Sequence, residues 1–208
     1  NALYGAYRLA RADTNGLSYF DNSTAGVWRS FFAAVLIAPL FLILLIIRFS
    51  VDDIGASAFR FYTIEAIAYV IGWVLFPLVV FYLVETLEKQ EYYVGFIIAY
   101  NWAAVLQNSL YLPFAIFFQV GLIPSEAAGL LNLILLGLVL AYTWFVAKTA
   151  LYISGAMAGG IIILDVGLWV ALTVTTESFV KSAIFSPITI RCPRLSIFSF
   201  EGSNSCAN

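Results

Sequence analysis

Long runs of apolar residues, separated by short polar segments, dominate the pattern of this chain. A bilayer core about 30 Å thick needs roughly 20 apolar residues in a helix. Runs of about that length cover residues 31–47, 66–84, 92–120, 127–147 and 157–176. A membrane β-strand would instead show about ten residues of alternating character. The pattern therefore predicts an all-α integral membrane protein, a bundle of about five transmembrane helices.

The residues on either side of these runs predict other structures. Near the start, apolar and basic side chains suit a short amphipathic helix lying in the membrane interface: Leu3, Tyr4, Tyr7, Arg8 and Arg11. Residues 21–24 then offer an N-cap for the helix that enters the membrane. We predict three parts: an N-terminal interfacial segment (1–26), a five-helix transmembrane domain (27–184) and an extended C-terminal tail (185–208).

The composition shows that lipid is the solvent for much of the chain. Hydrophobic residues make up 62% of the 208 residues and charged residues only 11%. A soluble domain carries about 25% charged residues, so this chain cannot cover a water-facing surface. The net charge of −2 argues against a nucleic-acid partner, which would require a basic stripe.

Missing residue types exclude several kinds of chemistry. The chain has no His and a single methionine, Met157, so His-dependent hydrolysis and His-based zinc, iron or haem sites are excluded. No nucleotide-binding, zinc-protease or nucleophile-elbow motif occurs. We predict no enzyme activity and no cofactor, although aromatic residues at 17% leave pigment or quinone contacts open. Cys192 and Cys206 could form a disulfide in an oxidising compartment.

Asp165 is the sharpest candidate for a functional residue, because it lies inside the last apolar run. An acidic side chain at that depth costs at least about 2.5 kcal/mol on insertion scales, so something must compensate. One interpretation is a proton or cation site, and the other is an acid that locks helices together. Lys148, at the end of the preceding run, is a candidate partner, unless its ammonium group reaches the lipid headgroups instead.

Amide side chains form the rest of a candidate intramembrane polar network. Asn101 and Asn108 are seven residues apart and share a helix face, with Gln107 next to them and Asn132 in the following run. Such amides could line a pore, but more often they join helices by hydrogen bonds.

Small residues at the start of the last run predict close helix packing. Gly155 and Gly159 form a GxxxG pattern, and Gly160 extends it. These glycines either tighten the hairpin of the last two helices or provide a contact for a partner.

The distribution of basic residues weakly favours a cytoplasmic N-terminus. With the N-terminus inside, five basic residues lie inside: Arg8, Arg11, Arg29, Lys89 and Lys148. Five lie outside: Arg48, Arg60, Lys181, Arg191 and Arg194. Because Arg191 and Arg194 are far from a span, discounting them favours the inside orientation. We predict a location in the bacterial inner membrane.

The layout resembles the Yip-type family of small five-span membrane proteins. These have a polar N-terminal segment, five closely spaced helices and a tight hairpin of the last two. Residues 2–11 (ALYGAYRLAR) and 28–33 (WRSFFA) are also similar to proteobacterial inner-membrane proteins of undefined activity. The resemblance implies a membrane-organising or accessory role and no active-site residue.

Two functions fit these observations. The first is a non-enzymatic structural or accessory protein, a subunit of a larger respiratory, photosynthetic or transport complex, with lipids and other membrane subunits as partners. The second is a small transporter or channel that uses Asp165 and the amides of the third run. We expect partner contacts along the last run and the tail, unless the tail folds back on its own bundle.

Overall fold

The computed structural model describes residues 1–52 and 54–182. Within these residues every regular element is a helix, so the all-α prediction is confirmed there. The elements are α1 (Ala2–Ala10), the 3-10 helix η1 (Thr14–Tyr19), α2 (Thr24–Ser30), α3 (Phe32–Val51), α4 (Ala58–Thr86), α5 (Gln90–Gln119), α6 (Ser125–Ala150) and α7 (Gly155–Lys181). The tail predicted for 185–208, with both cysteines, lies outside the described residues.

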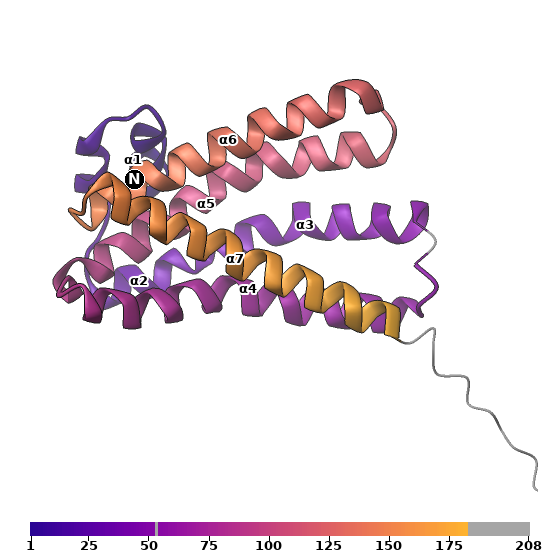
Figure 1. Ribbon diagram of the computed structural model, residues 1–208, viewed down its shortest axis with the longest axis horizontal. Coiled ribbons are helices and arrows are strands. Elements are labelled where there is room, and N and C mark those ends of the chain that lie inside the picture. Colours follow the sequence, from indigo (N-terminus) through magenta and orange to yellow (C-terminus); the bar gives the residue numbers. More distant parts are fainter. Residues whose placement is uncertain (53, 183–208) are drawn as a thin grey trace, which may run out of the picture.

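The five long helices run up and down in one bundle (Figure 1). Helices α3, α5 and α7 begin at the end of the bundle where α1 lies, and α4 and α6 finish there; we call this the α1 end. Helix α5 packs against α1, α2, α3, α4 and α6, whereas α7 packs against α4 and α6. Helix α5 is therefore the most central element.

Serine side chains fix where three of the helices begin. Ser23, Ser57 and Ser154 each accept a hydrogen bond from a backbone N–H in the first turn of the following helix. These N–H groups have no partner inside the helix, and a cap of this kind stabilises a helix by about 1 kcal/mol. The cap at Ser23 confirms the one predicted for residues 21–24.

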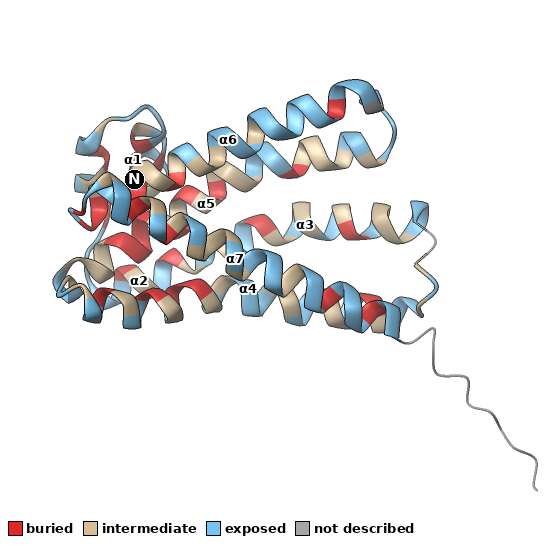
Figure 2. Ribbon diagram, viewed as in Figure 1, coloured by how far each residue is buried: buried red, intermediate tan, exposed pale blue. Residues whose placement is uncertain are grey.

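The core is concentrated at the α1 end (Figure 2). Helix α5 contributes more buried residues than any other helix, among them Phe96, Ile97 and Ile98. They pack with the last turns of α4 and α6, including Val84 and Val146. Smaller clusters lie farther along the bundle, so the helices are packed most tightly near α1.

Among the described residues, four segments are long and apolar enough to cross a membrane: Thr24–Val51, Ala58–Thr86, Glu126–Ala150 and Gly155–Lys181. They coincide with four of the five predicted runs. The other run, 92–120, forms the 30-residue helix α5, but it is not among the four. Its amides Asn101, Gln107 and Asn108 lower its hydropathy, so the count of five is not confirmed by length and composition.

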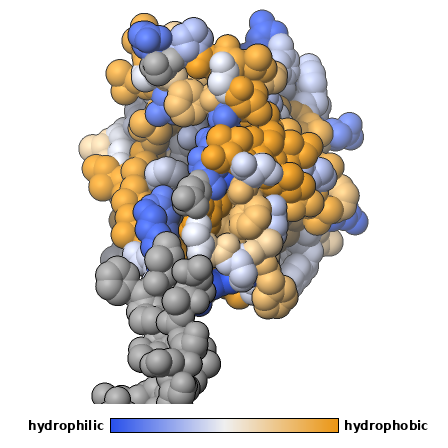
Figure 3. Space-filling model, turned by 90° about the vertical axis from the view of Figure 1, so that its right-hand side faces the viewer, coloured by the Kyte–Doolittle hydropathy of each residue, from blue (hydrophilic) through white to orange (hydrophobic). Residues whose placement is uncertain are grey.

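These four segments leave most of their apolar surface uncovered. In each, at most 22% of the most apolar 18-residue window is buried. Apolar side chains also cover much of the face opposite the α1 end (Figure 3). Because soluble monomers rarely expose apolar patches of this extent, the architecture is that of a membrane protein.

In the N-terminal segment α1 and η1 approach each other closely through their backbones, and α1 also packs against α5 and α6. Helix α1 buries Gly5, Ala6 and Leu9, and a Cβ built on Gly16 would lie 2.5 Å from the Gly5 carbonyl oxygen. A hydrogen bond joins α1 to α6, because the Tyr142 hydroxyl donates to the Ala6 carbonyl at 2.7 Å. Helix α1 is thus held by protein contacts, while Leu3, Tyr4 and Tyr7 stay exposed.

We predict that Gly16→Ala forces η1 away from α1 and loosens the N-terminal segment. The added methyl group meets backbone atoms that cannot move aside freely, and overpacking of this kind costs about 1–3 kcal/mol. Hydrogen exchange of the α1 amides should become faster in the variant. Gly160→Ala is the matched control, because a Cβ there meets nothing within 4 Å. Unchanged exchange at α1 in Gly16→Ala would contradict the close approach.

Candidate functional site

Asp165 lies on the inward side of α7, in line with the buried residues Ala158 and Ile161. Its Oδ1 accepts a hydrogen bond from the Tyr100 hydroxyl of α5 at 2.9 Å. Asp165 is ten residues after the start of α7 and Tyr100 is ten after the start of α5. Since both helices begin at the α1 end, each residue lies about 15 Å inside the bundle.

Aromatic rings surround the Tyr100 side of this pair. The Tyr100 ring lies 4.4 Å from that of Phe76 in α4 and 5.9 Å from that of Phe96 in α5, measured between centroids. A cation site would require several oxygen ligands at this point. Within residues 1–52 and 54–182, no group of three His, Cys, Asp or Glu side chains could hold a metal ion. One hydroxyl donor among aromatic rings fits a bond that links helices.

Lys148 does not pair with Asp165 in the structure. Its ammonium nitrogen lies 4.9 Å from the centre of the Trp144 ring, and the side chain is exposed. Because α6 ends at Ala150 and α7 begins at Gly155, the two residues differ in depth by about 12 Å. The alternative interpretation, with the lysine at the membrane surface, agrees with this position.

Asn101 is fully buried and joins α5 to α2. Its Nδ2 donates to the Ser30 hydroxyl at 2.8 Å, and that hydroxyl donates to the Val27 carbonyl at 2.7 Å. Both Asn101 and Ser30 have 0% exposure. The Asn101 Oδ1 has no hydrogen-bond partner among the described residues.

Gln107 joins α5 to α6, whereas its neighbour Asn108 does not leave its own helix. The Gln107 Nε2 donates to the Thr143 hydroxyl at 2.9 Å. The Asn108 Nδ2 donates to the Ala104 carbonyl at 2.8 Å, one turn back in α5. The predicted polar network is therefore divided into separate links, with Asn101, Gln107 and Asn108 contacting different groups.

Asn132 lies apart from all of these residues. It is exposed on α6, seven residues after the first residue of that helix. Leu130, Leu133 and Leu136 on the same helix are also exposed. An amide at this position faces lipid or another protein, and it does not contribute to the interior of the bundle.

Of the three glycines in the predicted small-residue contact, Gly155 alone lies against a neighbouring side chain. A Cβ on Gly155 would lie 3.0 Å from the Trp144 ring, and the Trp144 Nε1 donates to the Gly155 carbonyl at 2.9 Å. Gly159 and Gly160 have nothing within 4 Å of a built Cβ. Trp144 therefore closes the hairpin, and α6 and α7 move apart along the bundle (Figure 1).

Tyrosines supply the links that sequence reasoning missed. Besides Tyr100, the Tyr93 hydroxyl of α5 donates to the Pro77 carbonyl of α4 at 3.0 Å. The Tyr69 hydroxyl of α4 donates to the Ala34 carbonyl of α3 at 2.6 Å. Together with Asn101 and Gln107, Tyr93 and Tyr100 connect α5 to four other helices. We call these four side chains the α5 polar set.

Comparison with known proteins gives no relative for this arrangement. No family model matches the chain, and no curated protein or solved structure matches it either. The resemblance to the Yip-type family therefore stays a prediction.

We predict that Tyr100→Phe destabilises the bundle more than Asp165→Asn does. Among the described residues Tyr100 is the one hydrogen-bond donor to the Asp165 side chain. The phenylalanine removes this donor, whereas an asparagine oxygen still accepts from Tyr100. Hydrogen bonds inside membranes contribute about 0.6 kcal/mol on average and up to about 1.7 kcal/mol. The measurement is the free energy of unfolding of each variant in mixed micelles, compared with that of the wild type.

A double-mutant cycle tests the pairing itself. Tyr100→Phe and Asp165→Leu should be non-additive, because they remove the same bond. Lys148→Met and Asp165→Leu should be additive. The reverse result, with coupling to Lys148 and none to Tyr100, would contradict the geometry.

Proposed function

We propose that this protein is a non-enzymatic, five-span accessory protein that supports a larger complex in the bacterial inner membrane. The proposal agrees with the resemblance to the Yip-type family. It rests chiefly on one observation, which is that the α5 polar set is used to join helices. A transport path would instead need polar side chains that follow one another along the bundle.

The position of α5 supports counting it as a fifth transmembrane helix. It has 30 residues, so it is about 45 Å long and exceeds the thickness of the bilayer core. Helices α1, α2, α3, α4 and α6 all pack against it. Protein contacts satisfy the donors of its polar set, with Oδ1 of Asn101 left over among the described residues, so low hydropathy does not prevent it from spanning the membrane.

Asn132 supports a protein partner on the outer face of α6. In residues 127–141 it is the only side chain with a hydrogen-bonding group. The structure shows no hydrogen bond for it among the described residues. An amide within a helix of this kind commonly bonds to another helix, so we place a neighbouring subunit there, in addition to the contacts predicted for α7 and the tail.

The charge distribution supports an orientation with the α1 end in the cytoplasm. Five basic residues belong to that end: Arg8, Arg11, Arg29, Lys89 and Lys148. In the described part of the chain, three belong to the opposite end: Arg48, Arg60 and Lys181. An excess of basic residues marks the cytoplasmic side.

Native purification in mild detergent tests the accessory role. The wild-type chain should migrate with a defined larger complex, and Asn132→Leu should retain about three-fold less partner, as loss of one interhelical bond of about 0.6 kcal/mol predicts. Ser109→Ala, which removes an exposed hydroxyl from α5, should retain all of it. A chain that purifies alone and catalyses proton-dependent uptake, abolished by Asp165→Asn, would overturn the proposal in favour of a transporter.

A further inference from the structure

A hollow on the outer side of α1 is separate from every site described above. It has a volume of about 480 Å³ and is lined by Tyr4, Tyr7, Arg8, Arg11 and Asp13. Two arginines and two tyrosines thus face one space, with a single carboxylate among them. The hollow offers hydrogen-bond donors in excess of acceptors.

Arg8 and Asp13 form one wall of the hollow and neutralise each other. The Arg8 Nε donates to Asp13 Oδ2 at 2.7 Å, and Nη2 of Arg8 lies 2.5 Å from the same oxygen. The remaining Arg8 nitrogen donates to the Tyr19 hydroxyl at 3.1 Å. The hydrogen bond from Arg8, followed by that from the Asn15 backbone N–H, holds the pKa of Asp13 below its ordinary value. This pair is therefore fixed and ionised, and it leaves no net charge.

Arg11 supplies the net positive charge of the hollow, since the Arg8–Asp13 pair is neutral overall. Its guanidinium carbon lies 5.8 Å from the centre of the Tyr7 ring, and its Nη1 lies 3.5 Å from the Tyr7 hydroxyl. In the part of the chain that the structure describes, no acidic side chain lies within ion-pair distance of it. A guanidinium with free N–H groups beside tyrosine hydroxyls is well suited to bind a phosphate group.

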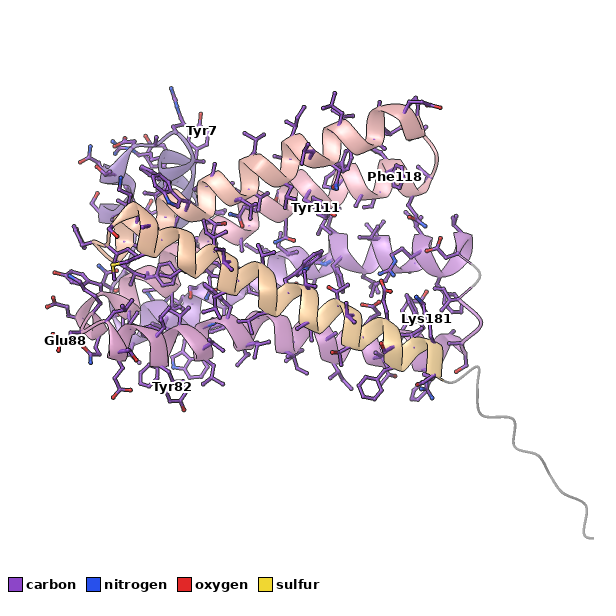
Figure 4. The ribbon with its side chains drawn as sticks, viewed as in Figure 1. Tyr7, Tyr82, Glu88, Tyr111, Phe118 and Lys181 are labelled. Carbon is purple, nitrogen blue, oxygen red and sulfur yellow. The ribbon has the colours of Figure 1, made fainter. Side chains whose placement is uncertain are left out.

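The hollow lies near the α1 end of the bundle, and in a bilayer we expect the lipid headgroups close to this end. The bond from Tyr142 to the Ala6 carbonyl holds α1 beside the last turns of α6, about 12 Å before the end of that helix. Amphipathic helices lie about 5–10 Å into the boundary between headgroups and acyl chains. Tyr7 lies on the outer flank of this region, away from the bundle (Figure 4), and Leu3 beside it is exposed.

We propose that this hollow binds the phosphate of an anionic lipid headgroup, with Arg11 as the main ligand. The hydroxyls of Tyr4 and Tyr7 donate to the same phosphate, while Leu3 contacts the acyl chains. The Arg8–Asp13 pair keeps the wall in place and is not itself the anion site. The assignment does not depend on the accessory role proposed above.

Lipid binding by the full chain tests this inference. We would titrate the purified protein with phosphatidylglycerol and, separately, with phosphatidylcholine, and count bound lipids by native mass spectrometry. The wild type should prefer phosphatidylglycerol, and Arg11→Gln should bind it about five-fold more weakly, the effect expected for one basic side chain at an anionic surface. Arg11→Lys should retain much of the preference because it keeps the charge.

Arg29→Gln is the matched control, since Arg29 is an exposed arginine at the same end of the bundle and is paired with Asp21. It should leave the preference unchanged; an equal loss in both variants would overturn the site in favour of general electrostatic attraction. Inorganic phosphate that competes fully for binding, with no preference between the two lipids, would overturn the lipid assignment. Hydrogen exchange of α1 should show that Arg11→Gln remains folded.

Discussion

The structure depends on one constraint, which is that polar groups inside a bilayer must find their hydrogen-bond partners within the protein. Helix α5 carries four polar side chains that bond to other helices, which are Tyr93, Tyr100, Asn101 and Gln107. Its Tyr100 bonds to Asp165 of α7, Asn101 to Ser30 of α2 and Gln107 to Thr143 of α6. Each of these bonds ends on a different helix. Helix α5 can therefore lie only where those helices surround it.

The same constraint explains the character of the outer helices. The donors of the α5 polar set all bond inside the bundle, and the other long helices present apolar side chains outward, as their low burial shows. Their packing is tightest at the α1 end, where α1, η1 and α2 add a further layer around the start of α5. At the opposite end fewer side chains are buried (Figure 2). The bundle is thus anchored at one end, and the α5 polar set connects the helices beyond it.

The fold class and the helices were largely predictable from the sequence, because 20-residue apolar runs allow few alternatives to a helix. The candidate site was less predictable from the sequence. Tyr100 and Asp165 each lie eight residues into their predicted runs, at 92–120 and 157–176, so their equal depth was present in the pattern. A tyrosine in an apolar run is usually an interfacial anchor, however, and the pattern gave no reason to treat this one differently.

Other features required the three-dimensional structure. The position of Lys148 depends on where α6 ends, which the sequence predicted only to within a turn. Gly159 and Gly160 follow the spacing of a helix contact, but the divergence of α6 and α7 leaves them open. Asn132 matched the amides of α5 in type, and only the packing shows that it faces outward. Rotation and divergence of helices depend on contacts between distant segments, which single-sequence patterns do not contain.

The most direct test of the account is the topology of α5, measured by cysteine labelling from each side of the membrane. Cys192 and Cys206 would first be replaced by serine, and single cysteines introduced as Glu88→Cys, Leu122→Cys and Ser154→Cys at exposed turn positions. Glu88 lies before α5 at the α1 end (Figure 4), and Leu122 follows α5 at the other end. If α5 spans the membrane, Glu88→Cys and Ser154→Cys are labelled from one side and Leu122→Cys from the other. Labelling of Glu88→Cys and Leu122→Cys from the same side would contradict the central position of α5 in a five-helix membrane bundle.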